Sequence, residues 1–519
     1  MAEIRPFRAY RYDANRVRLA EVLTQPYDKI TAEMQEQYYA ASPYNLIAVE
    51  KGKPRPEDSP RDSVYTRAAK KIDEWIADKI LVQDAAPSIY VYAQEYLVPG
   101  TQSGTRARRT RIGFIALGRV EDYAAGVVFP HERTLSAPKA DRIELLRATR
   151  AQTGQLFMLY DDAQRKIEHW LEDIAKKNAP IEMRDEFEVT HRLWPVADAE
   201  VIRRIQGAMA AQKLVIADGH HRYETALNFR NEMREKSGTN VLQAGDPHSS
   251  SPLTGDHPSS PVSGDRGGGD KAAGDHPSSP LTGDKDAASE FAMMTFINTH
   301  SKGLTILPTH RVVRNLEDFD FERFRKSVGA YFDWYSYPFQ NPEERAASYE
   351  DFRRDLEGTH HGRRAIGIFS SPSPTAGAGP VSNPSPGAGV GPVSGMASAG
   401  PGAFFLFLLR RDVDLELLLP DLSEGQRGLD VVLLHRVVFE KGLGITAEAV
   451  AAEKYVGYER EMDAAIAAVD RGEAQMALLL NPVRVEQVVK IALGGGVLPQ
   501  KSTDFYPKLL SGEAIYRVE

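Results

Sequence analysis

The sequence predicts an α/β protein, in which either an α/β or an α+β order of elements fits, interrupted by two low-complexity segments. Three observations lead to this prediction. Short segments rich in β-branched and aromatic residues alternate with longer segments of helical periodicity. A buried strand runs directly into a helix at residues 213–227, and two stretches rich in Pro, Ser and Gly separate such elements. The composition, 42% hydrophobic and 26% charged, is typical of globular domains.

The predicted strands are short apolar runs or alternate between apolar and polar residues. Residues 89–96 (IYVYAQEY) alternate and contain many β-branched or aromatic side chains, and residues 111–120 (RIGFIALGRV) are the expected pairing partner. The apolar run 403–409 is too short to span a bilayer, so we expect a buried strand there. Further strands are expected at residues 213–217, 293–298, 303–307, 476–480 and 514–518.

The predicted helices carry apolar residues at intervals of three and four. At residues 63–79 these residues are Val64, Ala68, Ile72, Trp75 and Ile76, which form one stripe on a helix. A helix stripe of this kind needs a partner surface, which the strands supply. Further helices are expected at residues 31–39, 199–211, 223–234, 321–330, 431–441, 459–471 and 483–492.

Two segments differ in composition from the rest of the chain. Residues 237–288 repeat the unit GDHPSSP, and residues 371–402 are rich in Pro, Gly, Ala and Ser. Such sequences bury too little apolar surface to offset chain entropy, so both are predicted to be disordered insertions. They divide the chain into an N-terminal α/β region (1–236), a continuation of that core (289–345) and a C-terminal α/β region (346–519).

Charge and cysteine content narrow the class of protein. The formal net charge is −8, the sequence contains no cysteine, and its first residues lack the apolar core of a signal peptide. A cytoplasmic protein that neither spans a membrane nor binds nucleic acid is therefore expected. The one dense basic run comprises Arg106, Arg108, Arg109 and Arg111, and it is interpreted as a solvated loop or strand edge.

The segment 213–227 (KLVIADGHHRYETAL) is the strongest candidate for a functional site. A buried strand ends at Asp218, Gly219 permits a tight turn with positive φ, and a helix begins almost at once. The free N–H groups of a helix start favour an anion, to which His220, His221 and Arg222 add donors and positive charge. Asp218 as an N-cap beside incidental histidines is the plainer alternative.

Three other segments are rich in donors for anionic ligands. They contribute His131, Lys139 and Arg142, then His310 and Arg311, and finally Lys501 and Lys508. Each segment alone resembles a solvated loop or a salt-bridge cluster. Phosphoryl transfer, however, needs several positive groups around one phosphate, so we expect these segments to converge with residues 218–222 on one basic pocket.

Carboxylates are the candidates for proton transfer and for metal binding. Asp28 follows the rigid turn at Pro26 and could act as a general base or bind Mg²⁺, although it could equally cap the helix at 31–39. Asp218 and Glu224 form a candidate Mg²⁺ pair. Their surroundings match no zinc motif.

The chain resembles the bacterial and archaeal family called domain of unknown function 1015. The resemblance rests on eight motifs in the same order, and both low-complexity segments fall between motifs. The motifs lie at residues 4–8, 26–28, 42–46, 130–132, 139–142, 217–227, 307–311 and 501–508.

The DGHHR motif at 218–222 is similar to the nucleotide-binding motif of the ParB/sulfiredoxin-like superfamily, which includes kinases that phosphorylate free serine. The resemblance implies a nucleotide-binding core of that type with additional α/β domains. It also implies ATP or ADP with Mg²⁺ as cofactors, phosphate contacts from residues 218–222, and Asp28 in place of the family's catalytic Glu. Asp28, Asp218 and His221 are then the candidate catalytic residues.

The function expected from these features is phosphoryl transfer from a nucleotide to the hydroxyl of a small metabolite, for which a serine-like acceptor fits. A non-catalytic nucleotide sensor and a ParB-like DNA-associated protein are the alternatives. The acidic balance argues against DNA binding. No Walker A or G-x-G-x-x-G motif precedes a helix, so a P-loop or Rossmann site is not expected.

Overall fold

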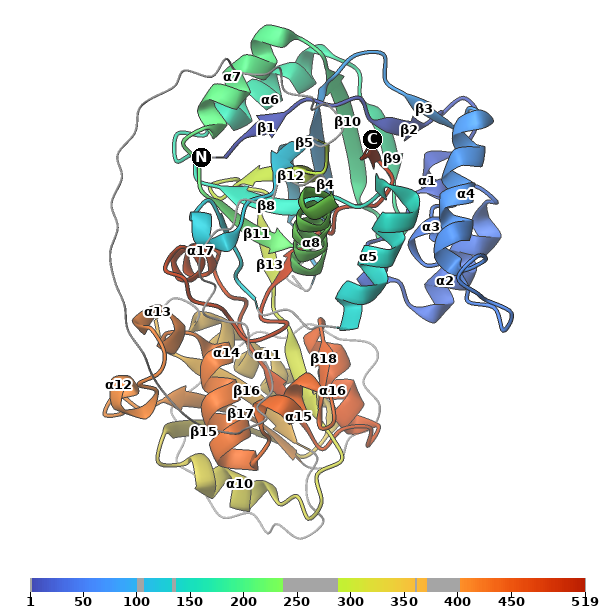
Figure 1. Cartoon of the computed structure of the whole chain (residues 1–519). Coiled ribbons are helices and arrows are strands. Elements are labelled where there is room, and N and C mark those ends of the chain that lie inside the picture. Colours follow the sequence, from blue (N-terminus) through green and yellow to red (C-terminus); the bar gives the residue numbers. More distant parts are fainter. Residues whose placement is uncertain are drawn as a thin grey trace, which may run out of the picture.

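A computed structural model describes residues 2–99, 107–132, 137–236, 288–359, 362–370 and 402–518, with backbone alone for 137–139. The two predicted insertions lie outside these residues, apart from Ala288 and Gly402 at their ends. The described residues form two lobes, an N-terminal lobe in blue to green and a C-terminal lobe in yellow to orange (Figure 1). This architecture confirms the predicted α/β class.

The N-terminal lobe is built on a nine-stranded mixed sheet of order β6-β11-β8-β12-β5-β4-β10-β9, with β1 paired to β5. The predicted partners β4 and β5 pair antiparallel, whereas β11 is parallel to β6 and β12 is parallel to β8. The strands are β1 (Ile4–Arg5), β4 (Ile89–Leu97), β5 (Arg108–Arg119), β6 (Val128–Phe129), β8 (Leu156–Tyr160), β9 (Ile181–Arg184), β10 (Thr190–Val196), β11 (Leu214–Asp218) and β12 (Phe291–Asn298).

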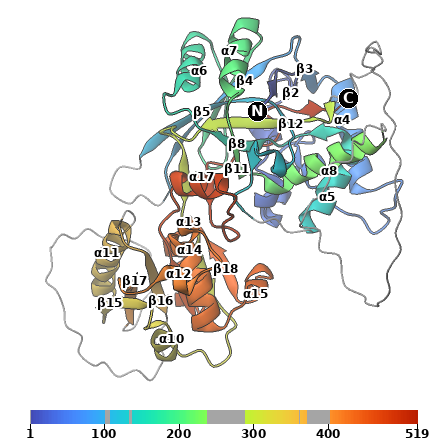
Figure 2. The same ribbon diagram turned by 60° about the vertical axis from the view of Figure 1, so that its left-hand side comes forward.

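Helices cover both faces of this sheet. Figures 1 and 2 show α6 and α7 on one side and α5 and α8 on the other, while α1 to α4 pack at one edge beside the short pair of β2 and β3. The predicted stripe of α4 is confirmed, since Ala68, Ile72 and Trp75 are buried. The bounds are α1 (Leu19–Val22), α2 (Ala32–Ala41), α3 (Ile47–Glu50), α4 (Val64–Ala77), α5 (Ala137–Thr149), α6 (Lys166–Lys177), α7 (Ala199–Met209), α8 (His220–Lys236), β2 (Tyr10–Tyr12), β3 (Leu81–Gln83), and the 3-10 turns η1 (Tyr27–Lys29) and η2 (Tyr123–Ala125).

The C-terminal lobe contains a second, six-stranded antiparallel sheet of order β15-β17-β16-β19-β14-β18. Its strands are β14 (His310–Val313), β15 (Phe332–Phe339), β16 (Ala365–Ser370), β17 (Gly402–Leu409), β18 (Val456–Glu459) and β19 (Met476–Leu479). Its helices are α10 (Phe321–Val328), α11 (Pro342–Gly358), α12 (Leu415–Leu418), α13 (Glu424–Arg427), α14 (Asp430–Leu433), α15 (Ala447–Ala451) and α16 (Met462–Asp470).

Two predicted elements of this lobe differ in detail. The helix expected at 431–441 begins as α14 and continues as a π-helix, η3 (Leu434–Leu443). Apolar periodicity over so few turns does not distinguish the two helix types. The helix expected at 459–471 is shorter, because Glu459 still belongs to strand β18.

The C-terminal segment crosses back from the second lobe to the first. Helix α17 (Val485–Leu493) is followed by β20 (Asp504–Tyr506), which pairs with β13 (Thr305–Leu307), and by β21 (Tyr516–Arg517), which pairs with β7 (Ala151–Gln152). The predicted boundary at 345/346 therefore does not coincide with the change of sheet. β14 already belongs to the second sheet, and the last strands return to the first lobe.

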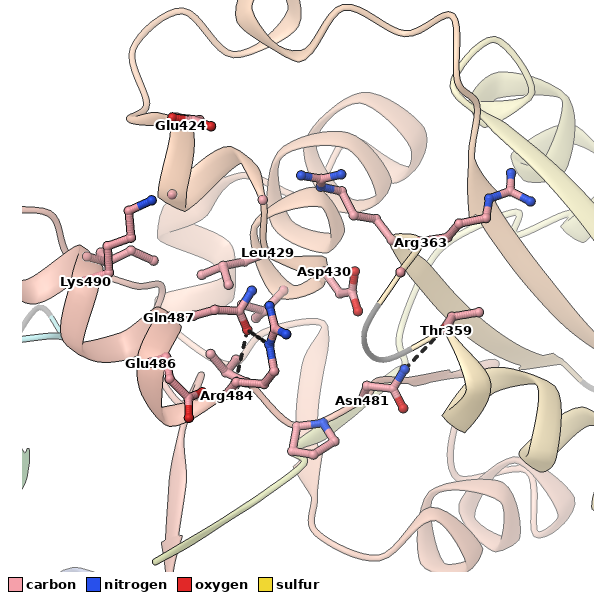
Figure 3. Close-up of a pocket in the computed structure, with 18 residues that line it drawn as sticks. Thr359, Arg363, Glu424, Leu429, Asp430, Asn481, Arg484, Glu486, Gln487 and Lys490 are labelled. Atoms are coloured by element: carbon pink, nitrogen blue, oxygen red, sulfur yellow. Dashed lines mark hydrogen bonds between the residues drawn. The ribbon is translucent and has the colours of Figure 1, made fainter. Parts of the chain in front are cut away.

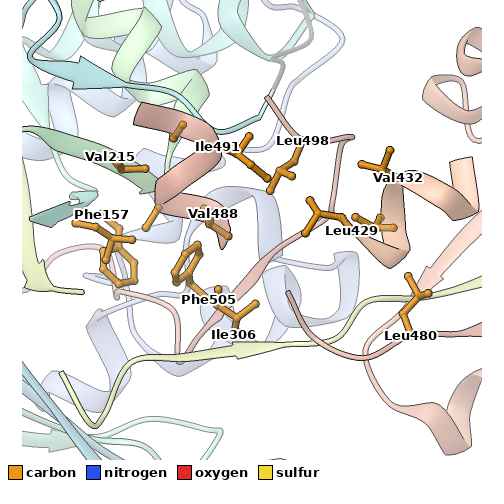
Figure 4. Packing of buried hydrophobic residues seen from close by; sticks show 14 of the residues in the cluster. Phe157, Val215, Ile306, Leu429, Val432, Leu480, Val488, Ile491, Leu498 and Phe505 are labelled. Atoms are coloured by element: carbon orange, nitrogen blue, oxygen red, sulfur yellow. The ribbon is translucent and has the colours of Figure 1, made fainter. Parts of the chain in front are cut away.

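A continuous apolar core joins the lobes along this crossing segment. Figure 4 shows Leu429 of the second lobe, Val488 and Ile491 of α17, and Val215 of β11 within one cluster, together with Phe505. Burying this surface holds α17 and β20 against the end of β11. Within the described residues, no helix is both long enough and apolar enough to cross a membrane.

A buried ionic cluster fixes the returning C-terminal segment against β10. His191 Nε2 lies 3.2 Å from Asp185 Oδ2, and its Nδ1 lies 3.3 Å from Glu513 Oε1 and 2.7 Å from the Tyr92 hydroxyl. Burial alone would lower the pKa of His191, but Asp185 and Glu513 outweigh it and raise the pKa to about 9. The imidazole is therefore charged at neutral pH.

This cluster predicts a loss of stability in mild alkali. Because the pKa of folded His191 exceeds its usual 6.5, the stabilisation is complete below that pH and is lost as pH rises through about 9. The free energy of unfolding should fall by about 2–4 kcal/mol between about pH 6 and about pH 10. Urea titration at several pH values measures the free energy of unfolding of the protein and of His191→Gln. If this free energy changed equally with pH in the two proteins, the prediction would be contradicted.

Candidate active site

The turn between β11 and α8 has the geometry that its sequence predicts. Strand β11 ends at Asp218, Gly219 has φ of +89°, and α8 starts at His220. The Tyr223 N–H donates to the Gly219 carbonyl at 2.9 Å, which closes the first helical turn. A helix start of this kind favours an anion, because its first N–H groups have no carbonyl one turn earlier in the helix.

Asp218 is held by cations from two segments and does not act only as a helix cap. Its Oδ2 lies 3.8 Å from Lys508 Nζ and 3.7 Å from Arg222 Nη2. Burial would raise the pKa of this carboxyl, but Lys508 and then Arg222 lower it far below its ordinary value. Asp218 is therefore ionised at any physiological pH, and it orients the two cations that a phosphate would contact.

Lys508 lies at the centre of a buried charge cluster. Its Nζ lies 3.1 Å from Asp504 Oδ1, and Arg460 Nε donates to Asp504 Oδ2 at 2.6 Å. Burial alone would lower the pKa of the ammonium, but the surrounding carboxylates, Asp218 first, raise it above its usual value. Burial likewise would raise the pKa of Asp504, but the cations around it, Lys508 foremost, lower it. The cluster is thus fully charged.

Arg222 is positioned by the backbone beneath the turn. Its Nη1 donates to the Gln155 carbonyl. Its side chain lines both a large cleft above the turn and a smaller neighbouring cavity. Arg142 lies in that smaller cavity, where its Nη1 is 3.1 Å from Glu50 Oε2 and its guanidinium lies 4.2 Å from the centre of the Tyr27 ring. Arg142 therefore supports the residue next to Asp28 and does not line the cleft.

The histidines under the turn are neutral, which differs from the charged donors expected from the sequence. His131 Nδ1 lies 2.5 Å from the Ile216 carbonyl, so it donates there, and the His131 N–H donates to His220 Nε2 at 3.3 Å. Burial lowers the pKa of both imidazoles, and that of His220 falls further because His131 lies beside it. His131 Nε2 contacts Thr503 Oγ1 at 2.7 Å, and this contact fixes Thr503, which lines the large cleft.

A cleft of about 510 Å³ lies above this turn and joins distant parts of the chain. Of the predicted site residues, eight line this cleft: Asp28, Asp218, Gly219, His220, His221, Arg222, Lys501 and Lys508. His131 and His310, which were expected beside them, do not line it. The further lining residues are Tyr27, Lys29, Glu132, Thr309, Tyr458, Glu459, Arg460, Thr503 and Asp504.

The cleft is balanced in charge, whereas the sequence suggested a basic pocket. Lys and Arg contribute five lining side chains, and Asp and Glu also contribute five. The cations are held in place by ion pairs. For example, Lys501 pairs with Glu453 and lies 4.1 Å from the Tyr458 ring centre. The cleft therefore suits a ligand that carries both anionic and hydrogen-bonding groups.

Two further predicted donors, His310 and Arg311, do not line the cleft. His310 accepts a hydrogen bond from the Leu480 N–H at 3.1 Å, and burial lowers its pKa to about 3. Arg311 donates to the Lys501 carbonyl at 3.0 Å, which fixes the loop below the cleft. Lys139 lies where only the backbone is described. Both His310 and Arg311 serve the structure around the site because their strand, β14, is buried.

The predicted metal pair of Asp218 and Glu224 does not form. Glu224 is not among the residues that line the cleft. It lies near Tyr123 of η2, whose pKa is raised by burial and also by this carboxylate. The described residues contain no group of three or more His, Asp or Glu side chains placed to bind one ion. A Mg²⁺ ion here would therefore need the phosphates of a nucleotide as its main ligands, as Mg²⁺ commonly has.

Arg111 is an important residue that the sequence analysis misinterpreted. It belongs to the basic run assigned to a solvated edge, yet only 1% of it is exposed. Its Nη2 donates to the Pro507 carbonyl at 2.6 Å and its Nη1 to the Tyr506 carbonyl at 3.2 Å, and it also bonds Gln94. Arg111 thereby fixes the backbone next to Lys508.

Comparison with known proteins identifies a family model that matches the chain and a few solved structures to which the chain is similar. A family model described as "Protein of unknown function (DUF1015)" matches residues 4–251 and 271–373, and no curated protein matches the sequence. Among solved structures, the chain is similar to a conserved hypothetical protein from Pyrococcus furiosus, with 10% identity and a TM-score of 0.30 over 76% of this chain and 92% of that one.

The chain is also similar to a mutant free serine kinase in complex with AMP, with 10% identity and a TM-score of 0.30 over 75% of this chain and 89% of that one. A second mutant of that kinase, in complex with ADP, gives a TM-score of 0.29 at the same identity and coverage.

Proposed function

The chain belongs to the DUF1015 family, as its motifs predicted, and on that premise we propose that it transfers a phosphoryl group from a nucleotide to the hydroxyl of a small molecule. The observation that carries this proposal is the cleft itself. It joins the N-terminus of a 17-residue helix, two cations held by Asp218, and the carboxylate of Asp28. These are the components that phosphoryl transfer needs.

The nucleotide phosphates would bind at the start of α8. There the N–H groups of the helix start and the helix dipole favour an anion. Arg222 and Lys508 converge on Asp218 from different segments, so both are already oriented when a phosphate arrives. Preorganised cations stabilise a transition state more than mobile ones do, because no reorientation is needed during the reaction.

Asp28 is the proposed base for the acceptor hydroxyl. It lies on the 3-10 turn η1 at the cleft, and within the described part of the chain its carboxylate makes no ion pair or hydrogen bond. Asp28 would take the hydroxyl proton as the hydroxyl oxygen bonds to phosphorus. The bond to the bridging oxygen of the nucleotide then breaks, and its electron pair stays on the departing phosphate beside Lys508 and Arg222. A serine-like acceptor fits this scheme.

Mg²⁺ bound with the nucleotide would neutralise part of the phosphate charge. Asp218, which ends β11 just before the start of α8, would be the protein carboxylate available to it there. The balanced charge of the cleft makes this contribution of Mg²⁺ useful, because a polyphosphate alone would add several negative charges to five lining carboxylates. The protein's own cations contribute the rest of the neutralisation.

Nucleotide binding tests this proposal directly. Calorimetry with ATP or ADP and Mg²⁺ should show binding, and Arg222→Gln should weaken it by about 1.5–3 kcal/mol, the range for hydrogen bonds to charged groups. Arg147→Gln removes an exposed arginine on the neighbouring helix α5 and should bind as the unchanged protein does. The proposal fails if the intact protein binds no nucleotide with Mg²⁺ present.

A second measurement separates a kinase from a nucleotide sensor. Asp28→Asn should retain nucleotide binding and lose phosphoryl transfer to hydroxylated metabolites, assayed by release of the product nucleotide. Binding without transfer in the intact protein, across a broad acceptor screen, would favour the sensor.

A further inference from the structure

A second cavity, of about 380 Å³, lies in the C-terminal lobe. Its walls come from Thr359 and residues 362–364, from α13 and α14, and from α17 with the residues that lead into it. Figure 3 shows side chains from these segments arranged around the space, with Arg484 and Gln487 on one side, Asn481 and Thr359 on another, and Asp430 between them. None of the described residues lines both this cavity and the cleft.

Four cationic side chains from separate segments line the second cavity: Arg363, Arg364, Arg484 and Lys490. Arg363 donates to the Leu409 carbonyl at 3.4 Å, and Arg484 Nε donates to Gln487 Oε1 at 3.3 Å. The buried Arg364 Nε has no hydrogen-bond partner in the described part of the chain. Cations gathered around one space with a donor left over favour an oxyanion.

Asp430 is the carboxylate that faces these cations. It accepts one hydrogen bond, from the Ala365 N–H at 3.2 Å, and among the described residues no cation lies within ion-pair distance of it. Burial raises the pKa of Asp430 to about 7, against the opposing effects of that hydrogen bond and of Arg364. Near neutral pH the acid form can therefore donate a hydrogen bond to a ligand oxygen. The other acidic lining residues, Glu424 and Glu486, are exposed.

The lining also limits the class of ligand. Among the described residues, no aromatic side chain lines the second cavity, whereas Tyr27 and Tyr458 line the cleft. A nucleobase would find no stacking partner here. A volume of about 380 Å³ is nevertheless in the range of small-molecule sites. The expected ligand is therefore small and aliphatic, and the cavity would recognise it mainly through its negatively charged group.

We propose that this cavity is a second ligand site, which binds a small aliphatic metabolite through a phosphate or carboxylate group. Arg364 and Arg484 provide the charged donors, and Asp430 and Asn481 bond the remaining polar groups of the ligand. The site is independent of the proposed phosphoryl transfer, because it shares no lining residue with the cleft.

Two probes test the site on the full chain, glycerol phosphate for a phosphate ligand and citrate for a carboxylate ligand. Calorimetry should detect binding of at least one of them. The double variant Arg364→Gln, Arg484→Gln should weaken that binding by about tenfold or more. Arg354→Gln, an exposed arginine on α11, is the matched control and should bind as the unchanged protein does.

Nucleotide binding in the same samples separates this proposal from that for the cleft. The double variant should keep its nucleotide affinity, while Arg222→Gln should keep its affinity for the probe. If the double variant does not fold, Lys490→Gln at an exposed position replaces it and should weaken the probe several-fold. Failure of both probes to bind, equal binding by the protein and these variants, or loss of the probe in Arg222→Gln would overturn the second site.

Discussion

Replacing Lys508 by methionine should reduce phosphoryl transfer by about 10²–10³-fold and lower the free energy of unfolding by about 3 kcal/mol. The Lys508 side chain is 9% exposed, and its Nζ lies between Asp504 at 3.1 Å and Asp218 at 3.8 Å. Methionine keeps the length of the side chain. It leaves the ionised carboxylates of Asp504 and Asp218 without their lysine partner in a poorly solvated site. Arg222 and Arg460 are also expected to move, because Asp218 and Asp504, which hold them, lose Lys508 as a partner.

Urea titration and the turnover assay measure the two effects of Lys508→Met. Lys53→Met removes a half-exposed lysine that pairs with Glu36, and it should change stability by less than about 1 kcal/mol. Adding Asp504→Asn to Lys508→Met should recover part of the stability and none of the turnover, because it removes a stranded charge without restoring the cation. A fully active Lys508→Met protein would contradict the role assigned to Lys508.

The local geometry of the site could be predicted from the sequence because it depends on neighbouring residues. An apolar strand, a glycine and an immediate helix allow few arrangements, and the structure has the expected positive φ at Gly219 and helix start at His220. The family motifs also identified Asp28, Lys501 and Lys508, which the structure brings to the same cleft from the two ends of the chain. Motifs far apart in sequence were thus a useful signal for one site.

The charge state of the site could not be predicted, because it depends on burial that only the tertiary structure creates. His131, His220 and His310 looked like cationic donors, yet burial makes each of them neutral. The negative charges were also missed. Asp504 was a residue between two lysines in the sequence, and its ion pair with Arg460 joins segments 44 residues apart.

The boundary between the lobes escaped prediction for a related reason. Strand β14 follows closely after β13 in sequence, but β13 pairs with the returning strand β20 while β14 enters the second sheet. Hydrophobic periodicity shows that a strand exists and does not show which sheet it joins. The change of sheet also shapes the cleft, since Thr309 lies between these two strands and lines it.

Replacing Arg111 by methionine should lower the free energy of unfolding by about 3–5 kcal/mol. Burial lowers the pKa of Arg111 to about 10 against the opposing effects of Tyr96, Tyr92 and Asp218, so its removal relieves a desolvation cost. That gain is smaller than the loss, because the Tyr506 and Pro507 carbonyls and Gln94 Oε1 would all lose their donor. These acceptors are enclosed, so water cannot replace the guanidinium.

The same substitution separates positioning from stability. Arg111 holds the backbone next to Lys508, so Arg111→Met should reduce turnover even at low temperature, where most of the variant is still folded. Arg108→Met, three residues earlier on β5 and 68% exposed, provides the matched control and should change stability by less than about 1 kcal/mol. A stable Arg111→Met protein with normal turnover would show that Lys508 is held by its carboxylates alone. A destabilised protein with normal turnover when folded would limit Arg111 to a structural role.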